Sequence, residues 1–215
     1  MVTETDVRRA LRGLEHEDAS VRLRAALAVG THPDAEFVGA LIERSAVEPE
    51  FYVRDMLTWA LTRHPAALTL PELLAEVRSE RAQARSQALH TLSKLGDRAA
   101  WPVITPALLA DADDEVARSA WRAAVVLVPD DERPELAAAL AAQLGRGGRD
   151  VRLSLSRALV ALGEVIMPAL RAAATRPGPE ARTHAIATER LLRDPDAGFE
   201  SAVEEAKRIV ALGGR

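Results

Sequence analysis

The sequence predicts an all-α fold, a right-handed α-α superhelix of about six helical pairs followed by a C-terminal capping helix. Three observations predict it. An arginine recurs at intervals of 30 to 34 residues, and Val or Ala precedes it each time. Apolar residues around it follow the spacing of one helix face, and no segment shows the two-residue alternation of a strand. We call these arginines the arginine column: Arg22, Arg54, Arg85, Arg118, Arg152 and Arg182.

A repeat of this length indicates a solenoid, in which each unit buries its apolar face by stacking on its neighbours. Such a chain grows along one axis, so we expect residues 1–215 to form one continuous domain. The repeats fall roughly at residues 3–30, 33–63, 67–95, 97–128, 130–162 and 163–193, with a cap at 194–215.

The arginine column marks the second helix of each repeat. In the third repeat Ala84, Ala88 and Leu92 lie on one helix face, and the fifth repeat has the same pattern. Glycine after the last apolar residue is the usual left-handed helix stop. The expected stops are Gly30, Gly96 and Gly163.

Shorter helices are expected between these, because proline is tolerated in a first helical turn and marks their starts. The prolines are Pro33, Pro71, Pro102, Pro134 and Pro168. The expected helices span residues 3–14, 34–47, 70–78, 98–110, 130–144 and 164–174. A final helix over 196–212 has the charged, wet face of a terminal cap.

Composition excludes several classes of function. The net charge of −4 disfavours a general nucleic-acid binder, and the absence of cysteine removes disulfides and thiolate metal sites. The five histidines form no metal-binding motif, so we expect neither a metal nor a cofactor. Residues 1–14 have no apolar signal core, and the apolar runs are shorter than a membrane span. We expect a soluble, cytoplasmic monomer.

The repeat pattern resembles a known family. The order is Val-Arg or Ala-Arg, paired Ala and Leu, Leu-Gly, then Pro-x-Leu, clearest in residues 84–109 and 151–170. It is similar to bacterial HEAT repeats of the phycobilisome-lyase-like type, and repeats 2, 4 and 6 are degenerate. Residues 51–65 also resemble uncharacterised actinobacterial HEAT-repeat proteins, some associated with MerR-type transcription regulators. The resemblance implies an interaction scaffold, although some members handle cofactors and others excise damaged DNA bases.

The arginine column has two interpretations. Three of its members follow an acid by four residues, in the pairs Asp18–Arg22, Glu50–Arg54 and Asp114–Arg118. This spacing favours ion pairs on one helix, so the column is expected to be an internal ladder that links successive repeats. The alternative is a basic stripe for an anionic partner. Arg85 lacks the acid and is the column member best placed to reach a ligand.

A candidate binding cluster lies in repeats 2 and 3. The HEAT resemblance implies that the second helices line the concave face, with residues one, two and five after the column arginine at its edge. Trp59 and His90 occupy equivalent positions in adjacent repeats, and aromatics with arginine are common interface anchors. We call this set the Trp59 cluster: Asp55, Trp59, Arg63, Arg85, Gln87, His90 and Lys94. The alternative is that Trp59 is a large core residue.

No catalytic motif is present. The Gly-rich segment 145–148 follows a helix instead of a strand, so it is expected to be a turn and not a phosphate loop. Helical-repeat base-excision enzymes use tryptophans around an aspartate in a basic groove, but here Trp59 follows Asp55 and the chain is acidic. No catalytic residue is therefore assigned.

The sequence thus predicts a non-enzymatic scaffold that binds a protein or peptide on its concave face. Two alternatives remain open. One is a regulatory or cofactor-handling module with a closed pocket near Trp59 and His90, and the other is a DNA-binding or base-excision-like HEAT protein.

Overall fold

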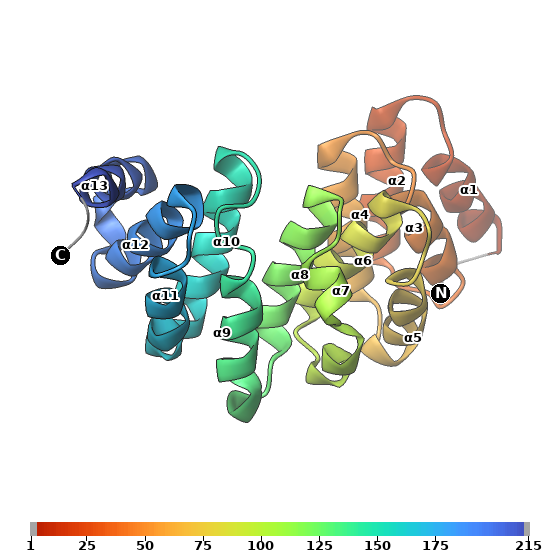
Figure 1. Cartoon of the computed structure of the whole chain (residues 1–215). Coiled ribbons are helices and arrows are strands. Elements are labelled where there is room, and N and C mark those ends of the chain that lie inside the picture. The colour runs from red at the N-terminus through yellow and green to blue at the C-terminus, as the bar shows by residue number, and fades with distance from the viewer. Residues whose placement is uncertain (1–3, 213–215) are drawn as a thin grey trace. The chain divides into compact units, whose positions relative to one another are not determined.

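The computed structural model describes residues 4–212, which form thirteen α-helices and four short 3-10 helices and contain no β-strand. The predicted all-α class is confirmed. The helices gather into two compact units, with the boundary between Val103 and Ile104, whereas the sequence predicts one continuous domain. Each unit is described by itself below (Figure 1).

The first unit is a stack of three helical pairs in two layers. The pairs are α1 (Glu4–Leu14) with α2 (Ala19–Thr31), α3 (Phe37–Ser45) with α4 (Phe51–Arg63), and α5 (Ala66–Glu76) with α6 (Ala82–Leu95), followed by η1 (Arg98–Val103). Helices α2, α4 and α6 pack side by side in one layer, and α1, α3 and α5 pack in the other. The column arginines Arg22, Arg54 and Arg85 lie in the α2–α4–α6 layer.

The second unit repeats this arrangement. Its elements are α7 (Pro106–Leu109), α8 (Asp114–Leu127), η2 (Asp130–Glu132), α9 (Arg133–Ala141), α10 (Arg149–Leu162), η3 (Gly163–Ile166), α11 (Met167–Ala174), α12 (Pro179–Arg193), η4 (Pro195–Ala197) and α13 (Phe199–Ala211). Helices α8, α10 and α12 pack in one layer, and α7, α9 and α11 in the other. The last helix, α13, packs on α12.

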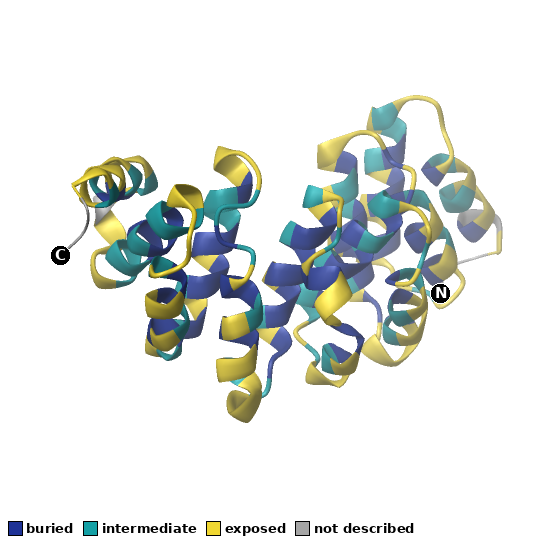
Figure 2. Cartoon of the chain, in the orientation of Figure 1, coloured by how far each residue is buried: buried dark blue, intermediate teal, exposed yellow. Residues whose placement is uncertain are grey.

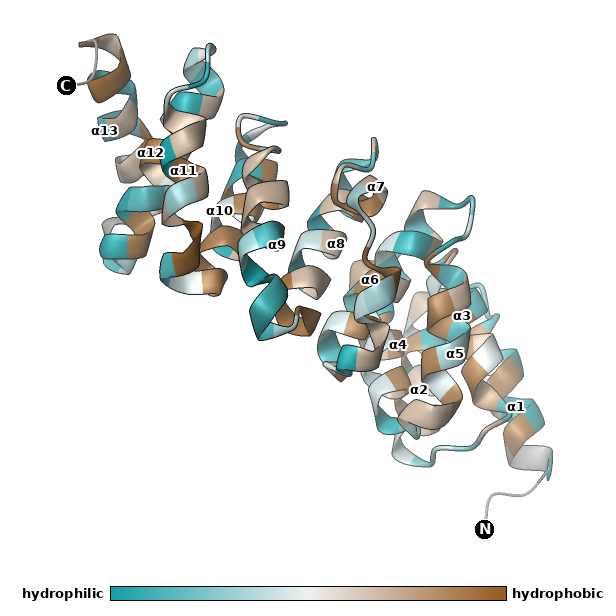
Figure 3. Cartoon of the chain, turned by 60° about the horizontal axis from the view of Figure 1, so that its bottom comes forward, coloured by the Kyte–Doolittle hydropathy of each residue, from teal (hydrophilic) through white to brown (hydrophobic). Residues whose placement is uncertain are grey.

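The core of each unit consists mainly of Ala, Leu, Val and Ile side chains. Buried residues lie on helix faces turned toward neighbouring helices, and exposed residues gather at helix ends and loops (Figure 2). Apolar and polar stretches alternate along the helices accordingly (Figure 3). Trp121 is fully buried, and its indole N–H donates to Leu109 O at 2.8 Å, which satisfies its polar atom.

One stretch, Arg149–Ala174, is long and apolar enough to cross a membrane by length and composition. The sequence prediction, which considered only uninterrupted apolar runs, did not find it. In the structure this stretch is α10, η3 and α11, and its most apolar part is 44% buried inside the protein. Helices that form the core of a soluble protein have the same composition, so the stretch is weak evidence for a membrane.

Several expected helix boundaries are wrong, and the helices expected over 130–144 and 164–174 are divided into η2 and α9 and into η3 and α11. Helix α5 begins at Ala66 and includes Pro71, because the segment after His64–Pro65 is already helical. The expected helix over 98–110 is divided into η1 and α7, and Thr105 caps α7 by accepting the Leu108 amide. Gly96, by contrast, ends α6 in the left-handed conformation, as expected.

Gly30 has a different role from the helix stop that the sequence predicts. Helix α2 continues through it to Thr31, and Gly30 faces Trp59 and Ala60 of α4. A Cβ at Gly30 would lie 2.3 Å from Trp59 Cζ3 and 2.9 Å from Ala60 Cα. Because Gly30 has no side chain, α4 can approach α2 closely, and one edge of the Trp59 ring packs against Gly30.

This close approach predicts the effect of two Gly→Ala substitutions. Gly39→Ala, in α3, meets nothing within 4 Å, so it should raise the free energy of unfolding by up to about 1 kcal/mol through helix propensity. Gly30→Ala should lower it by about 1–2 kcal/mol, because overpacking outweighs the same gain. Urea denaturation of both variants measures the difference. Equal stabilisation by both would contradict the close contact.

Candidate binding surface

Four of the six column arginines bind main-chain carbonyls of the loop that precedes their own helix. Arg54 Nη1 donates to Glu48 O at 2.9 Å and to Pro49 O at 2.6 Å. The same contact recurs at Arg22 (to His16 and Glu17), Arg85 (to Ser79 and Glu80) and Arg152 (to Gly147). Carbonyls after a helix end lack main-chain donors, and the guanidinium supplies them. In these four repeats the arginine therefore recurs because each loop before the second helix leaves carbonyls that need a hydrogen-bond donor.

The three expected ion pairs at four-residue spacing do not form. Asp18 caps α2 by accepting the Ser20 amide at 2.7 Å. Asp114 binds Arg146 of the following repeat at 2.8 Å. Arg118 contacts the acid three residues before it. A free backbone amide at the start of α2 competes for Asp18, and an arginine of the next repeat competes for Asp114.

Glu48 is the centre of the first unit. Its side chain is fully buried and receives Arg22 Nε at 2.7 Å, Arg22 Nη2 at 2.8 Å and Arg44 Nε at 2.8 Å. The Glu50 amide adds a fourth donor at 3.0 Å. Burial alone would raise the pKa of Glu48, but the bonds from Arg22, the Glu50 amide and Arg44 outweigh it and lower the pKa to about 2.

The backbone around Glu48 extends this network. The Glu48 carbonyl accepts from Arg54 and from the Gln83 side-chain amide, which also donates to Ser45 O at 3.0 Å. Side chains of α2, α3, α4 and α6 therefore meet at one loop. The sequence analysis missed Glu48 and Gln83. The local signal for Glu48 was Arg44 four residues before it, a spacing that permits an ion pair on one helix face, and Arg44 Nε does bind the Glu48 carboxylate.

In the second unit the comparable polar centre is His184 of α12. Its Nδ1 accepts the Gly145 amide at 3.1 Å, so the hydrogen of the neutral ring is on Nε2. Nε2 lies 3.0 Å from Arg152 O and 2.9 Å from Ser156 Oγ. Burial is the main reason that the pKa of His184 falls to about 4.

The remaining column members are more exposed. Arg152 pairs with Glu180 of the next repeat at 3.0 Å, but 71% of the Glu180 side chain is open to solvent. Exposed pairs of this kind contribute about 0–1 kcal/mol. Within residues 4–212, the structure gives the side chain of Arg182 no hydrogen bond or ion pair.

The residues of the Trp59 cluster lie on two helices that pack together, α4 and α6. Asp55, Arg63 and Lys94 are exposed, and nothing in the described part of the chain binds their side chains. Gln87 and His90 are half-buried on α6. Arg85 differs from the expectation, because loop carbonyls hold its guanidinium and it is not left without a partner.

Beside Trp59, helix α4 exposes two aromatic side chains, Phe51 and Tyr52, that the sequence analysis did not single out. Phe51 is 73% exposed, Tyr52 is 47% exposed and Trp59 is 37% exposed. The guanidinium carbon of Arg54 lies 5.9 Å from the centre of the Phe51 ring. Three of the chain's seven aromatic residues are thus exposed on one helix.

Comparison with known proteins identifies the fold. No protein-family model and no curated protein matches the sequence. Two solved structures of Kap121p, a HEAT-repeat karyopherin, match 95% of this chain with a TM-score of 0.58 and 18% identity, one bound to Nup53p and one to Pho4p. The chain has a HEAT-type solenoid fold. It spans about a quarter of Kap121p, because the match covers 26% of that protein.

A further similar structure is the complex of CpcE and CpcF, the phycocyanin lyase of Nostoc sp. PCC7120. It matches 94% of this chain and 93% of the lyase chain, with 17% identity and a TM-score of 0.42.

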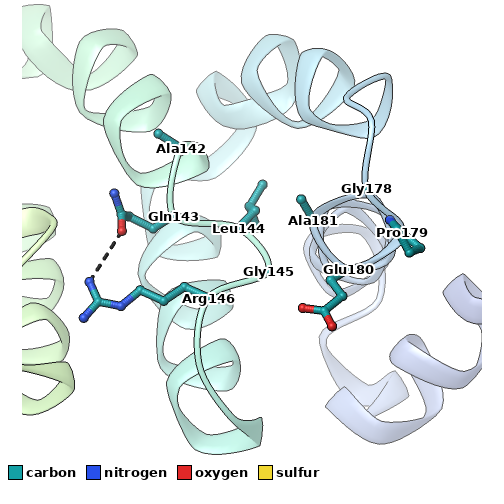
Figure 4. Close-up of a pocket in the computed structure, with 9 residues that line it drawn as sticks. All are labelled: Ala142, Gln143, Leu144, Gly145, Arg146, Gly178, Pro179, Glu180 and Ala181. Atoms are coloured by element: carbon teal, nitrogen blue, oxygen red, sulfur yellow. Dashed lines mark hydrogen bonds between the residues drawn. The ribbon is translucent and has the colours of Figure 1, made fainter. Parts of the chain in front are cut away.

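The surface also has open hollows away from the Trp59 cluster. One of about 640 Å³ lies between the segment after α9 and the start of α12 (Figure 4). Its Arg146 is already bound to Asp114 and lies 3.5 Å from the Gln143 side-chain oxygen. Among the described residues, no group of three or more His, Cys, Asp or Glu side chains could hold a metal ion.

The buried imidazole of His184 predicts a pH dependence. The folded protein binds the proton only near pH 4 and the unfolded chain near pH 6.5, so the stability from neutral His184 is complete above pH 6.5 and falls as the pH drops toward 4. Over this range the wild type should lose about 3 kcal/mol more than His184→Gln in urea denaturation. Titration of the ring near pH 6.5 by NMR would contradict this prediction.

Proposed function

We propose that this HEAT-type chain is a non-enzymatic scaffold that binds a protein or peptide partner through the side of the first unit formed by α4 and α6. The observation that carries the proposal is the exposed aromatic surface of α4, with Phe51, Tyr52 and Trp59. Only 3% of the chain is aromatic, so this concentration is not an average surface. Exposed aromatic side chains are frequent anchors of protein interfaces.

The charges near these aromatics support the same proposal. Most column arginines are held by loops and acids of the fold itself, whereas Asp55, Arg63 and Lys94 have no partner among the described residues. A surface that offers both signs of charge next to aromatic rings suits a protein partner better than a nucleic-acid backbone, which needs a basic surface. Kap121p, which shares the fold, has been solved bound to other proteins.

The chemistry of the buried polar groups supports a non-enzymatic role. Ser156 and His184 are in contact, as a nucleophile and its base would be. However, the Gly145 amide occupies Nδ1, so Nε2 carries the hydrogen and cannot accept the serine proton. This pair therefore serves packing of α10 on α12. A soluble, cytoplasmic, monomeric protein remains the expectation.

Charge reversal on α4 and α6 tests this function. Arg63→Glu/Lys94→Glu should fold normally, because neither side chain has a partner in the described structure. Proteins from the native host should be captured on the immobilised chain, and captured partners should be quantified by mass spectrometry. We expect the double variant to capture at least about tenfold less of the partner that the wild type captures. The reason is that each reversal places like charges against that partner.

The matched control is Arg12→Glu/Arg78→Glu. It makes the same change in net charge within the first unit, at exposed residues of α1 and of the segment after α5. Capture by this control should equal that of the wild type. Equal losses in both variants, or no loss in either, would reject α4 and α6 as the binding side.

A further inference from the structure

The last helix of the chain already occupies part of the face that carries the Trp59 cluster in other repeats. In repeat 6, the residue five positions after the column arginine is Ala187, equivalent to Trp59 and His90. Ala187 is fully buried against Ala202 and Ala206 of α13. The second unit thus seats a helix on these positions by small-residue contacts.

Next to α13 the same face is open. A groove of about 780 Å³ lies between α10 on one side and α12, η4 and the start of α13 on the other. Its apolar walls include Leu153 and Val160 of α10, Leu191 of α12 and Phe199 of α13. Leu153 and Arg157 are the residues one and five positions after the column arginine of repeat 5. The groove therefore continues the surface that α13 covers in repeat 6. We call it the C-terminal groove.

The two arginines of the C-terminal groove differ in their partners. Arg149 binds Glu200 of α13 and also Asp150, so its charge is used within the fold. Arg157 is exposed and lines the groove, and the structure gives it no hydrogen bond or ion pair within residues 4–212. An arginine beside an apolar surface binds a carboxylate strongly, because its forked donors match the two oxygens.

We propose that the C-terminal groove binds an amphipathic helix of a protein partner, which lies beside α13 and places an acidic residue on Arg157. Apolar residues of that helix, spaced three or four apart, contact Leu153, Val160 and Leu191. A helix suits this groove because its walls are helices and offer no sheet edge to an extended peptide. The adjacent α13 shows the mode of packing on this face. The site lies in the second unit and is separate from the Trp59 cluster, so it goes beyond the function proposed above.

A displayed library of helical peptides, selected on the full chain, provides the probe. Enriched peptides should carry an acid among apolar residues at three- and four-residue spacing. Arg157→Glu should weaken their binding at least about tenfold in fluorescence anisotropy, because it sets like charges against each other. A peptide with its acid changed to Lys should recover binding to Arg157→Glu but not to the wild type. This reciprocal exchange places the acid on residue 157.

The matched control is Arg171→Glu on α11, an exposed arginine of the same unit with no partner among the described residues. Its peptide affinity should equal that of the wild type, and both variants should melt within about 2 °C of the wild type, as surface changes do.

The proposal is overturned if no peptide is enriched, or if enriched peptides bind Arg157→Glu as well as the wild type. It is also overturned if peptide binding is lost only in Arg63→Glu/Lys94→Glu, which would support the Trp59 cluster instead. Self-association of the chain that Arg157→Glu abolishes would assign the groove to a second copy.

Discussion

The first unit depends on one buried carboxylate. Glu48 is withdrawn from water at the loop between α3 and α4, where its oxygens receive two guanidinium groups and a backbone amide. Removing one partner of such a pair leaves a buried charge without compensation, which costs about 3–5 kcal/mol. The low pKa of Glu48, about 2, means that this contribution is present above pH 4.5 and is lost as the pH falls toward 2. The loop, and through it the position of α4 on α2, is fixed by this group.

The contacts within the fold also distinguish arginines that hold the structure together from charged side chains that are available to a partner. The column arginines that bind carbonyls after a helix are part of the backbone's own hydrogen bonding, as at Arg54 and Arg85. A stripe of arginines in the sequence is therefore not a stripe of available positive charge in the fold. Several charges outside the loops have no partner among the described residues, including Arg63 and Lys94 in the first unit and Arg157 in the second, and in the column itself the same holds for Arg182. Both proposed surfaces are built on such residues.

Much of the fold could be predicted from the sequence, because the spacing of apolar residues along a helix and the interval between repeats can both be read from it directly. Gly96, for example, ends α6 in the left-handed conformation. Gly30 was misjudged, because its role is set by Trp59, which lies on another helix and is distant in sequence. The acid partners of the column were misjudged for a similar reason. Spacing of four residues permits an ion pair, but local amides and the next repeat compete for Asp18 and Asp114.

The candidate site was predictable only in part. The positions of Trp59 and His90 in adjacent repeats followed from the period. Whether a charged side chain is free or bound depends on contacts between repeats, and the spacing of residues in the sequence does not predict those contacts. Arg85 has no acid four residues before it, yet loop carbonyls hold it. The exposure of Phe51 and the open groove at Arg157 depend on how α4 and α13 are seated, and no local pattern encodes that.

The central claim is that the arginine column stabilises loops from inside the fold, most strongly at Glu48. A double-mutant cycle of Arg22→Met and Glu48→Gln, followed by urea denaturation, measures it most directly. We expect each single variant to cost about 3 kcal/mol and the double variant little more, which gives a coupling energy of about 2–3 kcal/mol. The same cycle at the exposed pair Arg152 and Glu180 should give about 0–1 kcal/mol. Additive losses at Arg22 and Glu48, with coupling no larger than that of the exposed pair, would contradict the claim.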